Sequence, residues 1–301
     1  MVKKKTVFED VKTYVEPKYT VGGPPSSVYS LPSPVSIRLI IFKQQMNQLH
    51  MKPDVTIIND IAKRAGKETL KFYRDDIDVN MKSDDSPLTK ADIASHREIV
   101  KGLNDHYPDI PVISEESEIP EYEERKEWKR YFLIDPLDGT KEFIKKNGEF
   151  TINIAYIENK IPVLGSVYIP AEEVLYFASK TEGAFKQIGE NAPKKIEHEE
   201  FDKNKPARIM VSRSHRGSDT KERLAEMGIE VSEEIPSGSS LKICFVAEGK
   251  ADLYPRFGPT MEWDTAAADA VYRYSGKNGS SDSPLMYNKE DLHNPEFIIG
   301  L

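Results

Sequence analysis

The stretch Asp135-Pro136-Leu137-Asp138-Gly139-Thr140 decides how the chain is interpreted, because it places two carboxylates where a buried strand is expected to end. The preceding residues 131–134 are apolar and aromatic, which is typical of such a strand. Pro136 lacks a backbone N–H and is expected to stop it. Gly139 permits close approach to a ligand, and Thr140 is a good N-cap for a helix over 141–144.

Carboxylates beside the free N–H groups of a helix start suit a divalent cation and a phosphate together. On its own, the stretch is equally typical of an Asx turn followed by a capping threonine. Its neighbours in the sequence therefore have to decide between these two interpretations.

Composition excludes several classes of protein. The chain has 301 residues, of which 31% are charged and 38% hydrophobic, as in ordinary soluble proteins. A formal net charge of −8, with no stripe of Lys and Arg to offset it, argues against general nucleic-acid binding. No run approaches the roughly 18–20 apolar residues that span a bilayer, so we expect no integral membrane segment.

Cys244 is the only cysteine, so an intrachain disulfide is impossible and a reducing compartment is expected. Its apolar neighbours favour a buried structural thiol over a reactive one. We therefore expect a cytoplasmic protein, and the sequence leaves peripheral contact with a membrane open.

Residues 1–50 differ from the rest. Residues 21–34 are rich in Gly, Pro and Ser, a composition that disfavours regular structure. The basic residues 3–5 are followed by acidic ones and not by the apolar core of a signal peptide. We predict a poorly structured N-terminal extension over 1–50, or an upstream stretch ahead of a start at Met51.

Beyond this extension, helical periodicity comes first and a strand meander follows. The pattern predicts helices over 54–72 and 86–100, a short strand over 110–113, and a partly antiparallel meander over 150–157, 161–168 and 174–179. After a charged connector, it predicts strands over 207–211 and 251–254, a loop over 255–259, and helices over 220–227, 241–247 and 266–274. Helices followed by a meander indicate an α+β fold.

Four acidic residues stand at predicted strand ends or helix starts: Glu115, Asp135, Asp138 and Asp264. Oxygen ligands from three segments are how proteins hold Mg²⁺, which takes the rest of its shell from water and substrate phosphate. Each residue also has an ordinary structural explanation: Glu115 and Glu116 suit a solvated turn, and Asp264 suits an N-cap. Asp92, in the first turn of the second helix, suits the helix dipole.

The motifs of several other enzyme classes are missing. The sequence contains no G-x-x-x-x-G-K-[ST] loop, no H-E-x-x-H, no C-x-x-C and no G-x-S-x-G elbow. What remains is metal-assisted phosphate chemistry.

The same residues resemble a known family. The strings SEES (114–117), DPLDGTKEFI (135–144) and EWDTAAADAV (262–271) resemble the signature segments of the Mg²⁺-dependent, lithium-sensitive phosphatases of the inositol monophosphatase superfamily. Four further strings are similar to the bacterial type of 3′(2′),5′-bisphosphate nucleotidase: SPLTKADIASH (86–96), NGEFTINIAYI (147–157), VSRSH (211–215) and GSSLKICFVAEGKADLYPRFGPT (238–260). The resemblance runs in order from about Asp54 to the C-terminus. One departure is the pair Ala268-Asp269, where relatives commonly have a Gly-containing pair.

The resemblance implies a layered α-β-α-β-α sandwich over 51–301, with a metal-site half (51–205) and a nucleotide-binding half (206–301). It implies two or three Mg²⁺ ions, whose ligands are Glu115, Asp135, Asp138, Asp264 and the backbone carbonyl of Leu137. It implies that the Thr140 hydroxyl, oriented by Asp92, positions and helps to deprotonate the attacking water. Glu116 is expected just behind the ligands.

By the same resemblance, the phosphate is held by the backbone N–H groups of Gly139 and Thr140. The residues expected to contact the nucleotide and its second phosphate are Ser212, His215, Gly238 and Lys242. Lys242 and His215 suit this role physically, since the retained phosphate carries charge that the metals do not reach. Arg256 is a further candidate for an anion contact.

The expected function is hydrolysis of the 3′-phosphate of adenosine 3′,5′-bisphosphate to AMP, which would clear a by-product of sulfate activation and extend to the sulfated nucleotide. An inositol (poly)phosphate or sugar phosphatase on the same metals is the nearest alternative, and VSRSH and GSSLK argue against it. A non-catalytic nucleotide sensor is an alternative of another class, against which the presence of Asp92 and Thr140 argues. The oligomeric state is open.

Overall fold

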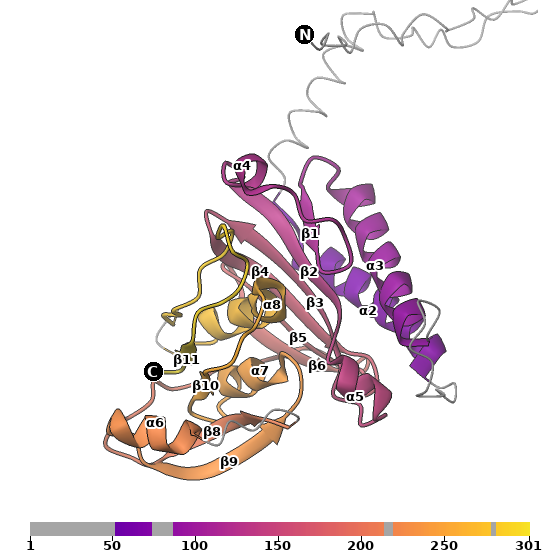
Figure 1. Cartoon of the computed structure of the whole chain (residues 1–301). Coiled ribbons are helices and arrows are strands. Elements are labelled where there is room, and N and C mark those ends of the chain that lie inside the picture. The colour runs from indigo at the N-terminus through magenta and orange to yellow at the C-terminus, as the bar shows by residue number, and fades with distance from the viewer. Residues whose placement is uncertain (1–51, 74–86, 214–218, 278–280) are drawn as a thin grey trace, which may run out of the picture. The chain divides into compact units, whose positions relative to one another are not determined.

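Two long helices precede the sheet that supports the acidic residues (Figure 1). The computed structural model describes residues 52–73, 87–213, 219–277 and 281–301. The predicted extension over 1–50 and His215 lie outside these residues. Helix α2 (Val55–Tyr73) confirms the first predicted helix, and α3 (Pro87–His106) continues the second beyond Val100.

A seven-stranded sheet follows, in the order β1-β2-β3-β4-β5-β6-β7. Its strands are β1 (Val112–Ser114), β2 (Arg130–Asp138), β3 (Thr151–Glu158), β4 (Ile161–Ile169), β5 (Val174–Ser179), β6 (Gly183–Ile188) and β7 (Lys194–Lys195). β1 pairs with β2 in parallel, and all later neighbours are antiparallel. The predicted meander is confirmed as β3, β4 and β5, and the sheet continues into β6 and β7, which the sequence pattern did not predict.

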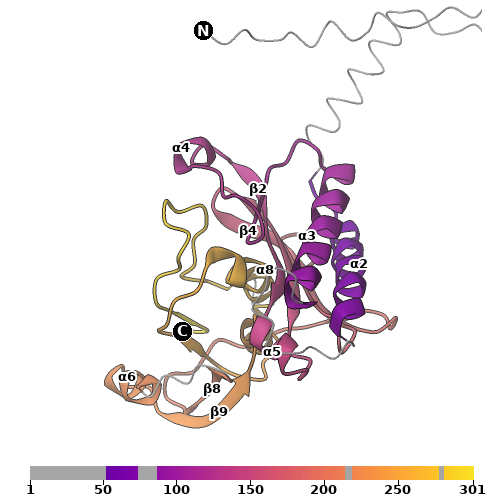
Figure 2. The ribbon, with the colours of Figure 1, turned by 45° about the vertical axis from the view of Figure 1, so that its right-hand side comes forward.

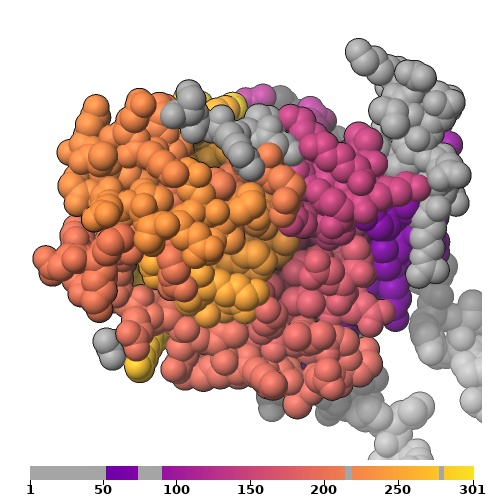
Figure 3. Space-filling view, turned by 90° about the horizontal axis from the view of Figure 1, so that it is seen from below, coloured from indigo at the N-terminus to yellow at the C-terminus, as the bar shows by residue number. Residues whose placement is uncertain are grey.

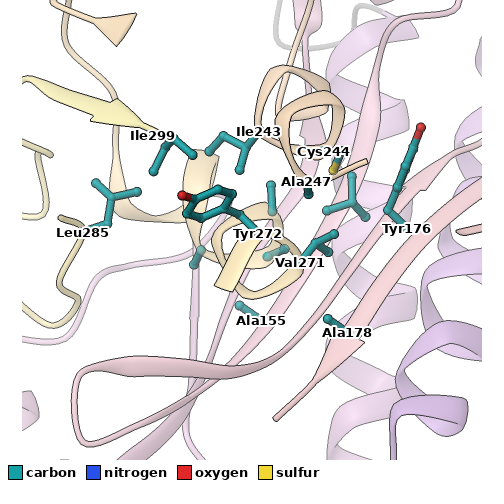
Figure 4. Close-up of a cluster of buried hydrophobic side chains, with 14 of the residues drawn as sticks. Ala155, Tyr176, Ala178, Ile243, Cys244, Ala247, Val271, Tyr272, Leu285 and Ile299 are labelled. Atoms are coloured by element: carbon teal, nitrogen blue, oxygen red, sulfur yellow. The ribbon is translucent and has the colours of Figure 1, made fainter. Parts of the chain in front are cut away.

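Both faces of this sheet are buried, and alternate residues point to opposite faces. On β2, Tyr131 and Leu133 join a core with α7 (Leu241–Ala247) and α8 (Glu262–Arg273). Phe132 and Ile134 join a second core with α2 and α3. Figure 2 shows α2 and α3 on one side of the sheet and α8 on the other. Figure 4 shows the first of these cores, where Cys244 and Ala247 of α7 lie near Val271 of α8 and Tyr176 of the sheet.

Beyond α7 and α8 lie two small two-stranded sheets and one further helix. β8 (Ala207–Ser212) pairs in parallel with β9 (Val231–Ser237), and β10 (Tyr254–Arg256) pairs antiparallel with β11 (Phe297–Ile299). Helix α6 (Thr220–Glu226) buries Leu224 against Ile209 of β8. The short helices α4 (Tyr122–Arg125) and α5 (Thr140–Ile144) flank β2 in the sequence. The layers are therefore helix, sheet, helix, sheet and helix, as predicted.

Close packing of α8 on the sheet depends on small residues. A Cβ atom on Gly165 of β4 would lie 2.2 Å from the backbone oxygen of Ala267 and 2.7 Å from Cβ of Ala270. The alanine-rich sequence of α8 is therefore explained by contact with the sheet.

Several predicted boundaries differ from those in the structure. The strand predicted over 110–113 is β1, which begins at Val112 and ends at Ser114. β2 does not end at Pro136 but continues to Asp138, because a register shift between Asp135 and Asp138 takes the proline out of the regular ladder. Past Ile134, β2 no longer pairs with β1, but it still pairs with β3 on its other edge. The strand predicted over 251–254 begins at Tyr254 instead and takes up part of the predicted loop.

Helix α8 begins earlier than predicted, at Glu262. Asp264 is therefore not the N-cap but the third helical residue, and its carboxylate accepts a hydrogen bond from the Met261 backbone N–H at 2.8 Å. This is the return half of a capping box, in which the side chain bonds back to the residue that starts the helix.

Cys244 is buried, as predicted, and burial raises the pKa of its thiol. Among the described residues, no helix combines the length and apolarity that crossing a membrane requires.

Candidate active site

Three carboxylates from distant parts of the sequence meet at one end of the sheet. Glu115 directly follows β1, Asp135 lies near the end of β2, and Asp264 lies in the first turn of α8. One carboxylate oxygen from each lies within 4.8 Å of the others. The parallel pairing of β1 with β2 brings the first two together, since their ends reach the same edge of the sheet. Packing of α8 against the sheet adds the third.

The irregular end of β2 holds its two aspartates in different places. The Asp135 carboxylate accepts a hydrogen bond from the Leu137 backbone N–H at 3.0 Å, and the Ser95 hydroxyl of α3 donates to the Pro136 carbonyl at 2.7 Å. The Leu137 side chain is buried beside Phe143 and Phe150. The bulge is therefore held to α3 by a hydrogen bond and anchored by an apolar side chain. The Leu137 carbonyl stays a predicted ligand.

Asp138 lies against the turn that opens α7. Its Oδ2 accepts hydrogen bonds from the Ser239 hydroxyl at 2.6 Å and from the Ser240 backbone N–H at 2.7 Å. Ser239 has φ of 51°, a left-handed conformation that is uncommon for a residue with a side chain. Its hydroxyl also contacts Thr151 of β3 at 2.5 Å. This turn therefore joins the predicted metal ligands to the second half of the chain.

Burial and mutual repulsion disfavour the charged forms of these acids. Burial, and then the charges of Asp138 and Glu115, raise the pKa of Asp135 well above its usual value. Burial raises the pKa of Asp264 to about 7, with repulsion from Asp138 as the second cause. The pKa values of Glu115 and Asp138 are raised as well, again chiefly by burial.

The donor atoms of this cluster fit a hard divalent cation. All are carboxylate oxygens, the ligands that Mg²⁺ and Ca²⁺ prefer, and they come from residues that gain from a nearby positive charge. The cluster could therefore hold a metal ion.

Asp92 lies on α3 and is buried, and its carboxylate is close enough to Glu115 and Glu116 to feel their charges. Burial, together with the charges of Glu116 and Glu115, raises the pKa of Asp92 to about 8. Within the described ranges, the structure gives no hydrogen bond between Asp92 and Thr140. Thr140 is the first residue of α5 and not its N-cap, a position taken by Gly139 at φ of 91°. The pairing of Asp92 with Thr140 stays a prediction.

A pocket of about 230 Å³ opens beside the acidic residues and extends toward the second half. Its lining includes the acidic residues Asp138 and Asp264 and the cationic residues Lys242 and Arg256. Thr140, Ser212 and Gly238 line it as well. Figure 3 shows the magenta surface that includes α5 lying against the orange surface of the second half. The structure therefore places several predicted site residues around one pocket: Asp138, Gly139, Thr140, Ser212, Gly238, Lys242, Arg256 and Asp264.

Two cationic side chains line the pocket. Lys242 is buried, its ammonium donates to the Ser239 carbonyl at 2.5 Å, and burial lowers its pKa to about 8. Arg256 donates from Nη1 to the Ser212 hydroxyl at 3.1 Å. The Nε of Arg256 is buried and has no hydrogen-bond partner within the described residues. Both groups are suited to an anionic ligand.

Gly238 is required by close packing. A Cβ atom there would lie 2.8 Å from Cγ of Glu142 and 3.1 Å from Oε2 of Glu149. Its role as a ligand contact stays a prediction.

Residues 50–278 match the model of the inositol monophosphatase family. The chain belongs to this family. The resemblance drawn from the three signature strings is thereby confirmed.

Individual proteins that are similar to this chain include bisphosphate nucleotidases. The chain is 44% identical over 246 residues to the 3′(2′),5′-bisphosphate nucleotidase CysQ of Escherichia coli strain K12, which covers 80% of this chain and 97% of that protein. It is 47% identical over 246 residues to CysQ of Salmonella typhimurium, with the same coverage of 80% and 97%.

Solved structures of a CysQ protein and of an inositol monophosphatase share the fold of this chain. The crystal structure of CysQ from Bacteroides thetaiotaomicron is 41% identical, with a TM-score of 0.69, over 83% of this chain and 97% of that one. An inositol monophosphatase from Anabaena shares the fold at 21% identity and a TM-score of 0.58, over 73% of this chain and 81% of that one.

The sequence pattern did not predict three residues that hold the end of β2 in place. Ser95, Ser239 and Ser240 each bond to the metal-site segment of β2. Ser239 and Ser240 lie within the string GSSLK, but the string alone gives no sign that they grip Asp138. Only the folded chain brings this turn to β2.

Proposed function

We propose that this chain is a Mg²⁺-dependent 3′(2′),5′-bisphosphate nucleotidase that hydrolyses the 3′-phosphate of adenosine 3′,5′-bisphosphate to AMP and phosphate. The name shared by the CysQ relatives supports this activity. The proposal includes the same reaction on the sulfated nucleotide, a role in clearing this by-product of sulfate activation in the cytoplasm, and inhibition by lithium.

The observation that carries the proposal is that one pocket is lined both by acidic residues of the proposed metal site and by two cationic side chains. The acidic residues are Asp138 and Asp264, and the cationic ones are Lys242 and Arg256. A substrate with one phosphate needs a single anion site. A substrate with two phosphates uses both sets of residues, with the reacting phosphate at the metal site and the retained phosphate beside the cations.

In this proposal the metal ligands are Glu115, Asp135, Asp138, Asp264 and the Leu137 carbonyl. They would hold two or three Mg²⁺ ions, and Glu116 would lie just behind them. When bound, the cations supply Lewis-acid polarisation of the phosphate and make a nearby water more acidic.

The remaining residues bind and orient. The backbone N–H groups of Gly139 and Thr140 hold the reacting phosphate, and the Thr140 hydroxyl orients the attacking water, with Asp92 as its proton acceptor. Phosphoryl transfer depends mainly on positioning and on stabilising charge, so no covalent intermediate is required. The contacts to the nucleotide are assigned to Ser212, His215, Gly238 and Lys242, joined by Arg256.

The test compares substrates on the purified full chain. Phosphate release from adenosine 3′,5′-bisphosphate and from inositol 1-phosphate is measured at equal concentration, with Mg²⁺ and with a chelator. We expect fast release from the nucleotide only, dependent on Mg²⁺, with AMP as the product. A higher kcat/KM for inositol 1-phosphate would overturn the substrate assignment, and no release from either would favour a nucleotide sensor.

A further inference from the structure

One ion pair at the rim of the pocket has no place in the proposed chemistry. Glu149 lies in the turn between α5 and β3, and Arg213 directly follows β8. The guanidinium of Arg213 donates from Nη2 to Oε1 of Glu149 at 2.5 Å and from Nε to Oε2 at 2.8 Å. This is a two-pronged contact with fixed geometry.

The same carboxylate also binds a third segment. The backbone N–H of Gly238 donates to Oε2 of Glu149 at 2.9 Å. Arg213 reinforces this connection, because its Nη2 donates to the Pro236 carbonyl at 3.2 Å and its backbone N–H to the Ser237 carbonyl at 3.2 Å. Glu149 and Arg213 therefore join the α5–β3 turn, the end of β8 and the β9–α7 turn.

These three segments carry the proposed ligand contacts of the pocket. The end of β8 carries Ser212, and the β9–α7 turn carries Gly238 and leads to Lys242. The next residue in that turn, Ser239, donates to Asp138. A shift of the turn would therefore move Lys242, a proposed contact of the retained phosphate, relative to the acidic residues.

The side chain of Arg213 is 42% exposed and that of Glu149 is 18% exposed, so solvent screens the pair in part and its contribution to folding is modest. The pair is also placed where a small displacement affects ligand geometry.

We propose that Glu149 is a positioning residue that, clasped by Arg213, sets the place of the Gly238 turn and thereby the affinity for the nucleotide. This inference rests on the proposed function, because it assigns the cationic residues of the pocket to the retained phosphate. We call the two residues the Glu149–Arg213 clasp.

A double-mutant cycle on the full chain tests the clasp. Glu149→Ala is expected to raise KM for adenosine 3′,5′-bisphosphate about tenfold, the size of effect typical of coupled contacts. We expect kcat and the Mg²⁺ concentration for half-maximal activity to stay within about twofold, since the metal ligands are untouched. Arg213→Ala should raise KM in the same direction, and the double variant should be no worse than Glu149→Ala. Glu149→Gln should recover part of the affinity, because its amide oxygen still accepts from Gly238.

The chain offers a matched control pair. Arg223 and Glu296 also form a two-pronged contact, at 3.0 Å and 2.6 Å, and neither residue lines the pocket. Arg223→Ala, Glu296→Ala and their double variant are expected to leave KM unchanged.

Amide hydrogen exchange gives a readout that does not depend on turnover. Faster exchange confined to residues 237–240 in Glu149→Ala supports the clasp, because the Gly238 amide loses its acceptor. Unchanged exchange there, or an equal increase across the chain, overturns it. An effect of Arg213→Ala on KM without one of Glu149→Ala also overturns it, since Arg213 would then act on the substrate directly.

Failure of the proposed function is separable from failure of the clasp. If the unaltered chain does not hydrolyse the bisphosphate nucleotide, the proposed function fails. The exchange of residues 237–240 then decides the clasp by itself.

Discussion

Asp138 differs from the other acidic residues in its partners. Both hydrogen bonds to its Oδ2 come from the Ser239–Ser240 turn, whereas Asp135 is bonded by its own strand. It therefore belongs both to the proposed metal ligands and to the contact with the turn that leads to Lys242. A substitution of Asp138 can therefore remove a proposed metal ligand while the fold stays intact.

Asp138→Asn should remove most activity and leave the fold intact. The Asn oxygen can still accept from Ser240, so the turn keeps its partner, but an anionic ligand is lost. We expect kcat to fall by at least about 100-fold, because even groups behind metal ligands cost 10–100-fold when removed. Circular dichroism and Tm check the fold. Near-normal turnover at saturating Mg²⁺ would exclude Asp138 as a ligand.

A substitution of Lys242 tests its proposed contact with the second phosphate. Lys242→Met keeps the length and apolar stem of this buried side chain but removes the charge. We expect the ratio of kcat/KM for adenosine 3′,5′-bisphosphate to that for a phosphate monoester to fall about 30-fold, in line with hydrogen bonds to charged groups. An equal loss on both substrates would place Lys242 at the reacting phosphate instead.

At the scale of elements, the contact between β4 and α8 decides where Asp264 lies. Gly165 allows α8 to approach the sheet, and the obstacle to a larger residue is the Ala267 backbone, which cannot rotate away. Because Asp264 lies one turn earlier on α8, a displacement of this helix also displaces a predicted metal ligand.

Gly165→Ala should destabilise the protein by about 2–3 kcal/mol through overpacking. It should also weaken Mg²⁺ activation, measured as a higher half-maximal concentration. Ser166→Ala is the matched control on the next residue, because the Ser166 hydroxyl is buried without a partner among the described residues. We expect that control to be neutral or slightly stabilising. Equal urea midpoints for Gly165→Ala and the unaltered chain would contradict this packing argument.

At the scale of the whole molecule, the acidic cluster opposes folding when no cation is bound. The pKa values of Asp92 and Asp264 are about 8 and about 7 in the fold, whereas an unfolded Asp has a pKa of about 3.9. Between these values the folded chain binds more protons than the unfolded one. Its stability therefore falls as pH rises through this window.

In the presence of a chelator, Tm should consequently be a few degrees higher at pH 6 than at pH 8. Saturating Mg²⁺ should raise Tm most at pH 8, where the carboxylates are ionised, and so remove or reverse this slope. Differential scanning calorimetry at both pH values, with and without Mg²⁺, measures the effect. A chelated protein with higher Tm at pH 8 would show that these pKa values are not raised.

The core also spans the proposed division at residue 205. Tyr131 and Tyr176 of the sheet share one apolar cluster with Ile243 of α7 and Val271 of α8. Folding of the acidic cluster and of the second half of the pocket is therefore linked by shared packing. The assignment of one half to metals and the other to the nucleotide stays a proposal.

The signature strings of the sequence were sufficient to identify the family, and that resemblance implied the layered fold class. Apolar periodicity predicted the helices and the strand meander, because it decides which faces of α2, α3 and β3–β5 are buried. Acidic residues at element ends also marked Glu115, Asp135 and Asp264 before their meeting could be seen. The sequence did not predict β9, whose residues Val231–Ser237 are mostly polar and gain their strand partner only from β8.

Tertiary structure alone decided how the site is held. The bulge at Pro136, the grip of Ser239 and Ser240 on Asp138, and the Glu149–Arg213 clasp all join residues far apart in the chain. Such contacts leave no local periodicity, because either partner is an ordinary polar residue until the fold brings the other to it. Chemistry was therefore visible in the sequence as residue types at the ends of elements, whereas geometry came from packing.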